Sequence, residues 1–254
     1  MFLSTNYSLA DLIHYAIGLF ESVYGPYQKQ KVIVEVTPDI YLRFSELCPN
    51  RSHSNNRNNV IGKMVFPDPG VGAYYILLHH SLLKDNLEFV QTLTHELCHL
   101  YDYLSFSSRY CLNPLNIDKH DLFSPLYMFS EFKSKALGYL CEYKFFSSEY
   151  ADNEEIDFYI NLDSALLEAK KEIIRSNFGA LYHGTRFLSK LYIQDILYHE
   201  DITSPLSLFI PDRYKEMANL YLFLRRHFNT NINAISFDSL RVLFNEAFDI
   251  YVTI

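Results

Sequence analysis

The segment His95-Glu96-Leu97-Cys98-His99 has the residue types and the spacing of a metal-dependent hydrolytic site. On an α-helix, residues four apart are separated by about 40° around the axis and by about 6 Å along it, so both imidazoles can bind one ion. Glu96 lies about 100° around the axis from His95 and can reach a water molecule at an open coordination position. The pattern predicts His95 and His99 as zinc ligands and Glu96 as the general base.

The opposite side of this helix carries an apolar stripe. Apolar residues recur there at three- and four-residue intervals, at Val90, Leu93, Leu97, Leu100 and Leu104. This periodicity predicts one face toward a hydrophobic core and one toward a chemical site. Asp102 shares the histidine face, so we expect its carboxylate to accept a hydrogen bond from a ligand imidazole, with surface solvation as the alternative.

A catalytic zinc ion usually has three protein ligands and a water molecule, so the two histidines need a partner. Glu131, His120 and Asp102 are the candidates, in that order. The short side chain of Asp102 begins about 10 Å along the axis from His95. Glu131 is expected on a second helix that can cross the first, and its alternative role is a surface ion pair with Lys135. We therefore predict Glu131 as the third ligand.

The motif His95-Glu96-x-x-His99 followed by a helical Glu131 resembles the zincin metallopeptidases of the gluzincin type, in which two histidines and a downstream glutamate bind zinc. The sequences Thr94–His99 and Ser130-Glu131-Phe132 are also similar to small bacterial and phage-associated zincin-like proteins. The resemblance covers about residues 60–140. Ser105 stands where a metzincin has its third histidine. The resemblance implies a zincin-like fold and a zinc cofactor.

These features predict a zinc metallopeptidase, a hydrolase whose partner is a protein or peptide substrate. The metal lowers the pKa of a water molecule, and Glu96 passes its proton to the leaving amine. Tyr127 or His183 is expected to assist the oxyanion. Two alternatives stay open: a zincin-like binding or regulatory protein with a structural or lost metal site, and a zinc hydrolase that acts on a non-peptide amide or ester.

Composition narrows the class of protein further. Hydrophobic residues make up 49% of the 254 residues, enough for a substantial core. The net charge of −8, without a cluster of Lys and Arg, argues against nucleic-acid binding. No apolar run reaches the length of a membrane span, and the first residues lack a secretory signal. We expect a cytoplasmic protein, with signal-less export left open; the oligomeric state is not predicted.

The periodicities predict an α+β fold, zincin-like, with a small mixed sheet and an active-site helix followed by a mostly helical C-terminal part. Residues 1–105 are expected to form a subdomain with the sheet and the metal-binding helix, and residues 106–254 a helical subdomain that carries the third ligand, together one compact unit. Strands are expected at 31–36, 60–66 and 73–78, the last two as a hairpin, and segment 40–47 is ambiguous. Polar loops are expected at 51–59 and 105–123. Helices are expected at 8–24, 124–147, 153–175, 185–200, 211–228 and 236–251, with caps at Asn153, Thr185 and Ser236.

Overall fold

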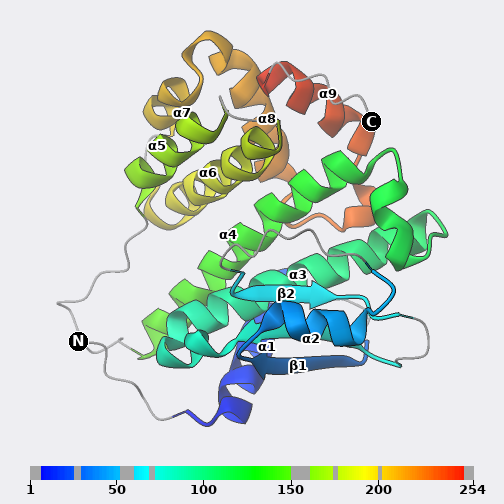
Figure 1. The fold of residues 1–254 in the computed structure, drawn as a ribbon. Helices are drawn as coiled ribbons and strands as arrows, with labels where there is room; N and C mark the ends of the chain where they lie inside the picture. The colour runs from blue at the N-terminus through cyan, green and yellow to red at the C-terminus, as the bar shows by residue number, and fades with distance from the viewer. Residues whose placement is uncertain are drawn as a thin grey trace.

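The computed structural model describes residues 7–25, 30–51, 60–68, 72–149, 161–173, 177–199 and 202–248. Most of these residues are helical, and the strands form one small mixed sheet, as the α+β prediction requires. The sheet lies at one end of the molecule and the C-terminal helices at the other, with α3 (Asn86–Arg109) and α4 (Phe123–Glu149) between them (Figure 1). The two central helices therefore connect both parts of the fold.

The sheet contains three strands in the order β1-β3-β2. Their bounds are Val32–Thr37 for β1, Gly62–Val65 for β2 and Tyr74–His79 for β3. β1 runs parallel to β3 and β2 runs antiparallel to it, so the predicted hairpin is confirmed. β2 pairs with β3 alone among the described strands, and on its other edge the Met64 N–H donates to Glu96.

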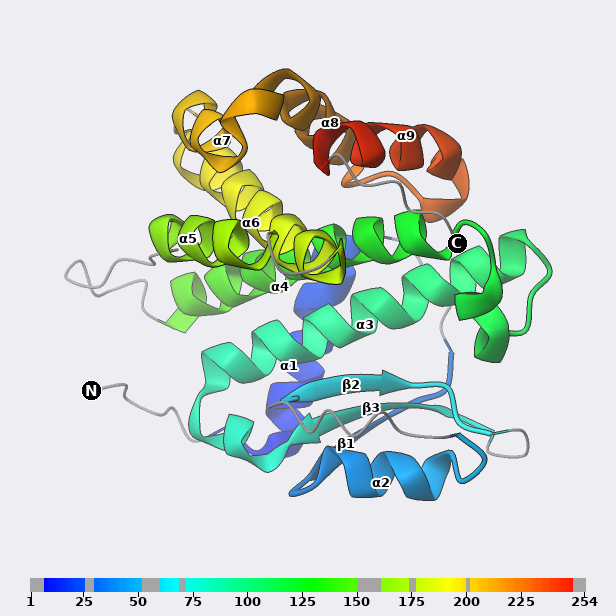
Figure 2. The same cartoon turned by 45° about the horizontal axis from the view of Figure 1, so that its top comes forward.

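The two faces of the sheet are covered by different helices (Figure 2). The ambiguous segment 40–47 folds as α2 (Ile40–Leu47), because Asp39 caps it and its apolar residues pack with Val65 and Leu77 on one face. The side chains of Ile76 and Leu78 point to the other face and join the main core beneath α3. Each strand of the hairpin is thereby held from both sides.

The N-terminal helix α1 (Leu9–Tyr24) begins after Ser8, whose side chain accepts a hydrogen bond from the Asp11 N–H, as predicted. α3 begins after Asp85, which caps it through two backbone N–H groups. α3 continues through Arg109, so the predicted loop from residue 105 is wrong in its first five positions. Phe106 is fully buried, and Arg109 donates to the Ile235 carbonyl at 2.9 Å, which together hold this last turn in place.

α4 passes very close to α3. A Cβ atom added to Gly138 would lie 3.0 Å from the carbonyl oxygen of Gln91 on α3, so a residue without a side chain is needed at this crossing. The absence of a side chain at Gly138 thus allows the close approach of the two helices. The crossing brings the middle of α4 beside the middle of α3.

Five helices follow α4 in the described chain. They are α5 (Leu162–Ile173), α6 (Asn177–Tyr198), α7 (Thr203–Phe209), α8 (Tyr214–His227) and α9 (Phe237–Phe248). The predicted cap at Thr185 is wrong, because Thr185 is buried inside α6. Ser236 accepts a hydrogen bond from the Ser239 N–H at the start of α9, as predicted. The predicted cap at Asn153 and residues 52–59 of the predicted loop 51–59 lie outside the described residues.

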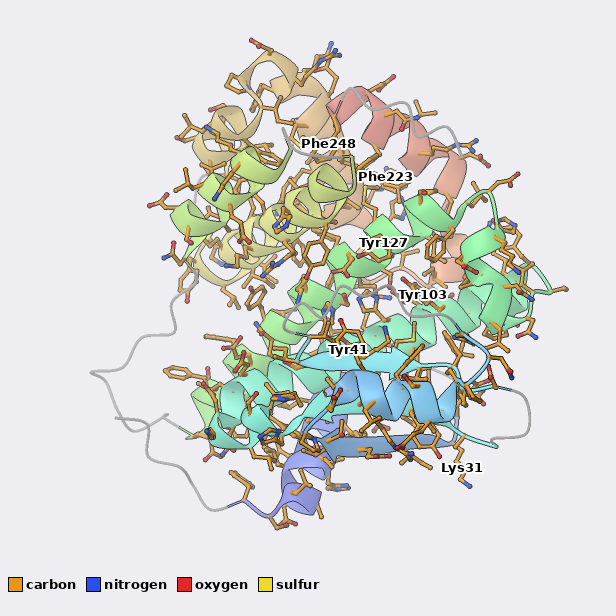
Figure 3. The ribbon with its side chains drawn as sticks, viewed as in Figure 1. Lys31, Tyr41, Tyr103, Tyr127, Phe223 and Phe248 are labelled. Carbon is orange, nitrogen blue, oxygen red and sulfur yellow. The ribbon has the colours of Figure 1, made fainter. Side chains whose placement is uncertain are left out.

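Short 3-10 helices connect several of these elements, at His80–Lys84, Pro114–Lys119, Pro211–Arg213 and Ile232–Ala234. One hydrophobic cluster extends from α1 through α3 and α4 to α9. The expected boundary at residue 105 falls inside α3, so the N-terminal and C-terminal halves share both a helix and a core. Tyr103 and Tyr127 lie between the sheet and the C-terminal helices (Figure 3).

Among the described helices, none combines the length and the apolar character that a membrane crossing requires.

The close crossing of α3 and α4 predicts opposite effects of the same substitution at two helical glycines. We expect Gly138→Ala to lower the free energy of unfolding by about 1–2 kcal/mol, because the methyl group collides with the Gln91 backbone. We expect Gly18→Ala, in open space on α1, to raise it by about 0.5–1 kcal/mol through helix propensity. Urea unfolding of both variants measures the effects; equal stabilisation by both would contradict the close crossing.

Candidate metal centre

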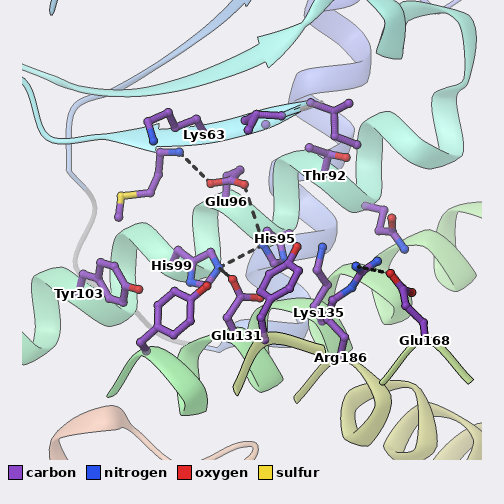
Figure 4. Close-up of a pocket in the computed structure, with 17 residues that line it drawn as sticks. Lys63, Thr92, His95, Glu96, His99, Tyr103, Glu131, Lys135, Glu168 and Arg186 are labelled. Carbon is purple, nitrogen blue, oxygen red and sulfur yellow. Dashed lines mark hydrogen bonds and ion pairs between the residues drawn. The ribbon is translucent and has the colours of Figure 1, made fainter. Parts of the chain in front are cut away.

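His95 and His99 on α3 and Glu131 on α4 form one buried cluster, with exposed fractions of 7%, 6% and 5%. The Nε2 atoms of the two histidines lie 3.1 Å apart, and His99 Nε2 lies 3.4 Å from Glu131 Oε1. Candidate ligand atoms of the three residues all lie within 4.8 Å of one another. The structure thus brings together the three residues that the sequence proposed as ligands (Figure 4).

The cluster fits a zinc ion by two observations. Two ligand atoms about 2.0–2.1 Å from a tetrahedral ion lie about 3.3 Å apart, close to both measured separations. Glu131 Oε2 is buried and has no hydrogen-bond partner among the described residues. A buried carboxylate oxygen without a partner is costly, and a cation satisfies it. Two imidazoles and one carboxylate are also the donor set of many catalytic zinc sites.

The hydrogen-bonding of His99 orients it toward the cluster. Its Nδ1 atom lies 2.8 Å from Ser130 Oγ, on α4. Ser130 is fully buried and precedes Glu131, so the same turn of α4 supplies the third candidate ligand and the partner of the second. A partner on one ring nitrogen fixes the ring and leaves the other nitrogen for a metal. Sequence reasoning did not find Ser130 in this role, because its contact depends on how α4 crosses α3.

The pKa values of the cluster follow from burial and from the pairing of its members. Burial lowers the pKa of His95 far below its usual value, with the charge of Lys135 adding to the effect. Burial alone would lower the pKa of His99, but the hydrogen bond and charge of Glu131 raise it. Burial would likewise raise the pKa of Glu131, but the hydrogen bond from His99 lowers it. The lowered pKa values favour the deprotonated forms of His95 and Glu131, whereas His99 must give up its proton to Glu131 or to solvent before it can bind a metal.

The side chain of Glu96 extends from α3 toward β2 and not toward Glu131. Its Oε2 atom accepts a hydrogen bond of 2.7 Å from the Met64 N–H, and its Oε1 atom lies 3.9 Å from His95 Nε2. Burial raises the pKa of Glu96, which makes its carboxylate a stronger proton acceptor than an exposed one. The contact requires Gly62, because a Cβ atom there would lie 2.4 Å from the Thr92 side chain and 3.2 Å from that of Glu96.

The cluster opens into a cavity of about 1100 Å³. Its walls come from β2 and from α3, α4, α5 and α6, so both halves of the chain form it. Tyr103, Tyr127, Lys135, Tyr182 and Arg186 line it in addition to the cluster and Glu96. The sequence singled out Tyr127 alone among these five for a role in the chemistry. The cavity has room for several residues of a peptide.

Asp102 does not play the predicted role. It is fully buried, which excludes surface solvation, and it contacts neither imidazole within hydrogen-bonding distance. Its Oδ1 atom accepts hydrogen bonds from Tyr24 on α1 at 2.9 Å and from Lys133 on α4 at 3.4 Å. Asp102 lies two helical turns after His95, where α3 packs against Tyr24 of α1 and Lys133 of α4. Its carboxylate stabilises the packing of three helices.

Two further residues that the sequence proposed for the site, His120 and His183, lie away from the cluster. His120, the alternative third ligand, packs its ring on Phe106 and Tyr110. His183, one of two predicted oxyanion donors, lies 3.3 Å from Glu168 and does not line the cavity. Tyr127, the other predicted donor, lines the cavity, and its hydrogen bond with Glu131 lowers the pKa of that carboxyl. Tyr127 is therefore the candidate donor that the structure leaves near the cluster.

Comparisons of the chain with protein-family models, with curated proteins and with solved structures found no match. The class of protein is therefore inferred from the site itself. Its donor set can hold a divalent cation, and a buried carboxylate with a raised pKa stands beside it at the wall of an open cavity. Such an arrangement can activate a water molecule against a substrate in the cavity.

Ser130→Ala removes the partner of His99 Nδ1, so we expect zinc affinity to fall about 10- to 100-fold. Ser107→Ala is the matched control, because Ser107 is a buried serine on α3 whose hydroxyl has no hydrogen-bond partner among the described residues. Competition with a chromogenic zinc chelator measures both affinities. Unchanged affinity in Ser130→Ala would contradict the orienting role of this hydrogen bond.

Asp102→Asn tests the corrected role of Asp102. We expect the free energy of unfolding to fall by about 3 kcal/mol, because Lys133 loses its buried charged partner. We expect zinc affinity to stay within about threefold of the parent, since no metal ligand contacts Asp102. Urea unfolding and chelator competition on the same preparation separate the two effects. A large loss of affinity without loss of stability would restore the role that the sequence suggested.

Proposed function

We propose that the protein is a zinc-dependent metallopeptidase of the zincin type, with a gluzincin-like set of ligands. The observation that carries the proposal is the convergence of His95, His99 and Glu131 in one buried cluster, with Glu96 beside it at the wall of a large cavity. Structural zinc sites are usually closed by four protein ligands, whereas catalytic sites keep a position for water. Three candidate ligands at an open cavity favour the catalytic kind.

Each residue of the cluster has a defined part in this proposal. His95, His99 and Glu131 hold the ion, and when bound it polarises a water molecule and the carbonyl group of the substrate. Glu96 takes a proton from that water at one carboxylate oxygen and delivers it to the leaving amine nitrogen. The Met64 N–H keeps Glu96 turned toward the cavity. The raised pKa of Glu96 supports both uptake and release of the proton.

Tyr127 supplies a neutral hydrogen-bond donor in the proposed reaction. Burial raises the pKa of Tyr127, so its hydroxyl group keeps its proton at physiological pH. This hydroxyl group donates to Glu131 in the structure; turned from Glu131 to the substrate, it can stabilise the negative charge that develops on the substrate oxygen. His183 is not assigned to this task because it lies off the cavity.

The position of the outer edge of β2 at the cavity favours a peptide as the substrate. The His79 N–H donates to the Ile61 carbonyl, so the backbone of residue 61 faces β3. Backbone groups of alternate residues in an antiparallel strand face opposite sides, and those of Gly62 and Met64 therefore face away from β3, toward the cavity they line. Because the Met64 N–H donates to Glu96, an extended peptide would add to this edge through the backbone groups of Gly62 and the Met64 carbonyl, with its scissile bond near the cluster.

A pair of substitutions tests the assignment of roles. We expect Glu131→Ala to weaken zinc binding at least about 100-fold, because a charged ligand is lost. We expect Glu96→Gln to keep its zinc and to lose hydrolysis by about 10³-fold, because the proton acceptor is removed and the shape is retained. Metal analysis and mass spectrometry of a digested peptide library provide the readouts, with chelator-treated protein as the control.

Two results would count against these roles. Full activity of zinc-loaded Glu96→Gln would remove Glu96 from the mechanism. Tight zinc binding by the parent with no cleavage of any peptide would favour a binding protein with a structural metal, or an enzyme for a non-peptide amide or ester.

A further inference from the structure

Lys135 is a cation inside the cavity that the proposed reaction does not use. It lies one helical turn after Glu131 on α4, a rise of about 6 Å, and it lines the same cavity. Figure 4 shows its side chain beside His95, on the side of the cluster away from Tyr103. Its charge lowers the pKa values of His95, Glu96 and Glu131.

The ammonium group of Lys135 has no hydrogen-bond or ion-pair partner among the described residues. Burial lowers the pKa of Lys135 by more than the charges of Glu131 and Glu96 raise it. Lys133, two residues earlier, shows the alternative: its Nζ atom donates to Asp102 and lies over the ring of Tyr24. An unpaired buried cation is costly, so its presence in a cavity indicates a ligand of opposite charge.

Arg186 on α6 brings a second cation to the same end of the cavity. Figure 4 shows its side chain beside that of Lys135. Arg186 has one acidic partner in the described chain, Glu168 at 3.9 Å, and the side chains of this pair are 31% and 51% exposed. So long and exposed an ion pair leaves most of the five guanidinium donors available.

No carboxylate at the cavity forms an ion pair with Lys135 in the described chain. Glu131 Oε1 faces His99, Glu96 Oε2 accepts from the Met64 N–H, and Glu168 lies near His183 and Arg186. Glu131 and Glu96 act on Lys135 through their charge at longer range. Together with Arg186, Lys135 can bind a planar, doubly accepting anion such as a carboxylate.

We propose that Lys135 and Arg186 form a subsite that binds a carboxylate of the substrate next to the scissile bond. The inference rests on the proposed peptidase function. The carboxylate belongs either to the C-terminus of the peptide or to an acidic side chain. Because Lys135 lies about 6 Å along α4 from Glu131, and an extended peptide advances about 3.3 Å per residue, this carboxylate lies within about two residues of the cleaved bond.

Peptide pairs that differ in one carboxylate test the proposal. One pair is an N-terminally dye-labelled hexapeptide pool of uncharged residues, made as the free acid and as the C-terminal amide. The second is the amidated pool with Glu or Gln at each position in turn. Cleavage by the zinc-loaded parent is measured by mass spectrometry. Binding is measured by fluorescence polarisation on zinc-loaded Glu96→Gln, so that affinity is recorded without turnover.

Two variants of Lys135 and one control are measured in the Glu96→Gln background. Lys135→Met removes the charge at similar length, Lys135→Arg keeps it, and Lys144→Met is the matched control on an exposed part of α4. We expect peptides with the carboxylate to bind at least about tenfold more tightly than their neutral partners. Lys135→Met should abolish this preference, while Lys135→Arg and Lys144→Met should retain it. Zinc content and thermal unfolding confirm that each variant is folded and loaded.

The outcomes separate this inference from the proposed function. A free-acid preference that depends on Lys135 supports the C-terminal carboxylate, and a Glu preference that depends on Lys135 supports the side-chain carboxylate. Equal binding of acid and neutral peptides overturns the subsite even if the parent cleaves both. If the parent cleaves nothing, peptidase function fails, yet a preference in the binding assay that is lost in Lys135→Met still supports the anion subsite.

Discussion

The packing of α3 against β2 on one side and α4 on the other is the constraint on which the site depends. Both contacts occur at a glycine: a side chain at Gly62 would collide with Thr92, and one at Gly138 would collide with the Gln91 backbone. The first approach lets the Met64 N–H reach Glu96, and the second brings Glu131 beside His99. A small widening of either contact would separate groups that must lie within hydrogen-bonding distance to act together.

The buried polar groups around α3 indicate the ligands of the site by which of them have partners within the chain. Charged groups inside a protein are stable when they are paired, and here most are: Asp102 with Lys133 and Tyr24, His99 with Ser130 and Glu131, and Glu96 with the Met64 N–H. At the cavity, Glu131 Oε2 has no hydrogen-bond partner and the ammonium group of Lys135 has no ion-pair partner in the described chain. The first suits a cation and the second an anion, which is the complement expected of a metal and an acidic substrate.

The incorrect predictions share a physical origin. Asp102 lies on the same face of α3 as the two histidines, as its helical position predicts. The helical position does not show which other helices pack beside that turn of α3, and there Asp102 contacts Tyr24 of α1 and Lys133 of α4. The predicted loop from residue 105 looked polar, yet Phe106 is buried and Arg109 caps carbonyls of residues 232 and 235 far along the chain. Thr185 has the side chain of a helix cap, but its neighbours bury it inside α6.

The sequence by itself determined what depends on neighbouring residues in the chain. The 3.6-residue period placed His95, Glu96 and His99 on one side of a helix, and the β-branched and turn residues predicted the hairpin. It also selected Glu131 as a candidate ligand by residue type. Only the tertiary structure decided that Glu131 Oε1 lies 3.4 Å from His99, that β2 holds Glu96, and that Lys135 and Arg186 share a cavity. These contacts join residues from separate elements, and the crossing of helices and strands that creates them is set by core packing, which leaves no local pattern in the sequence.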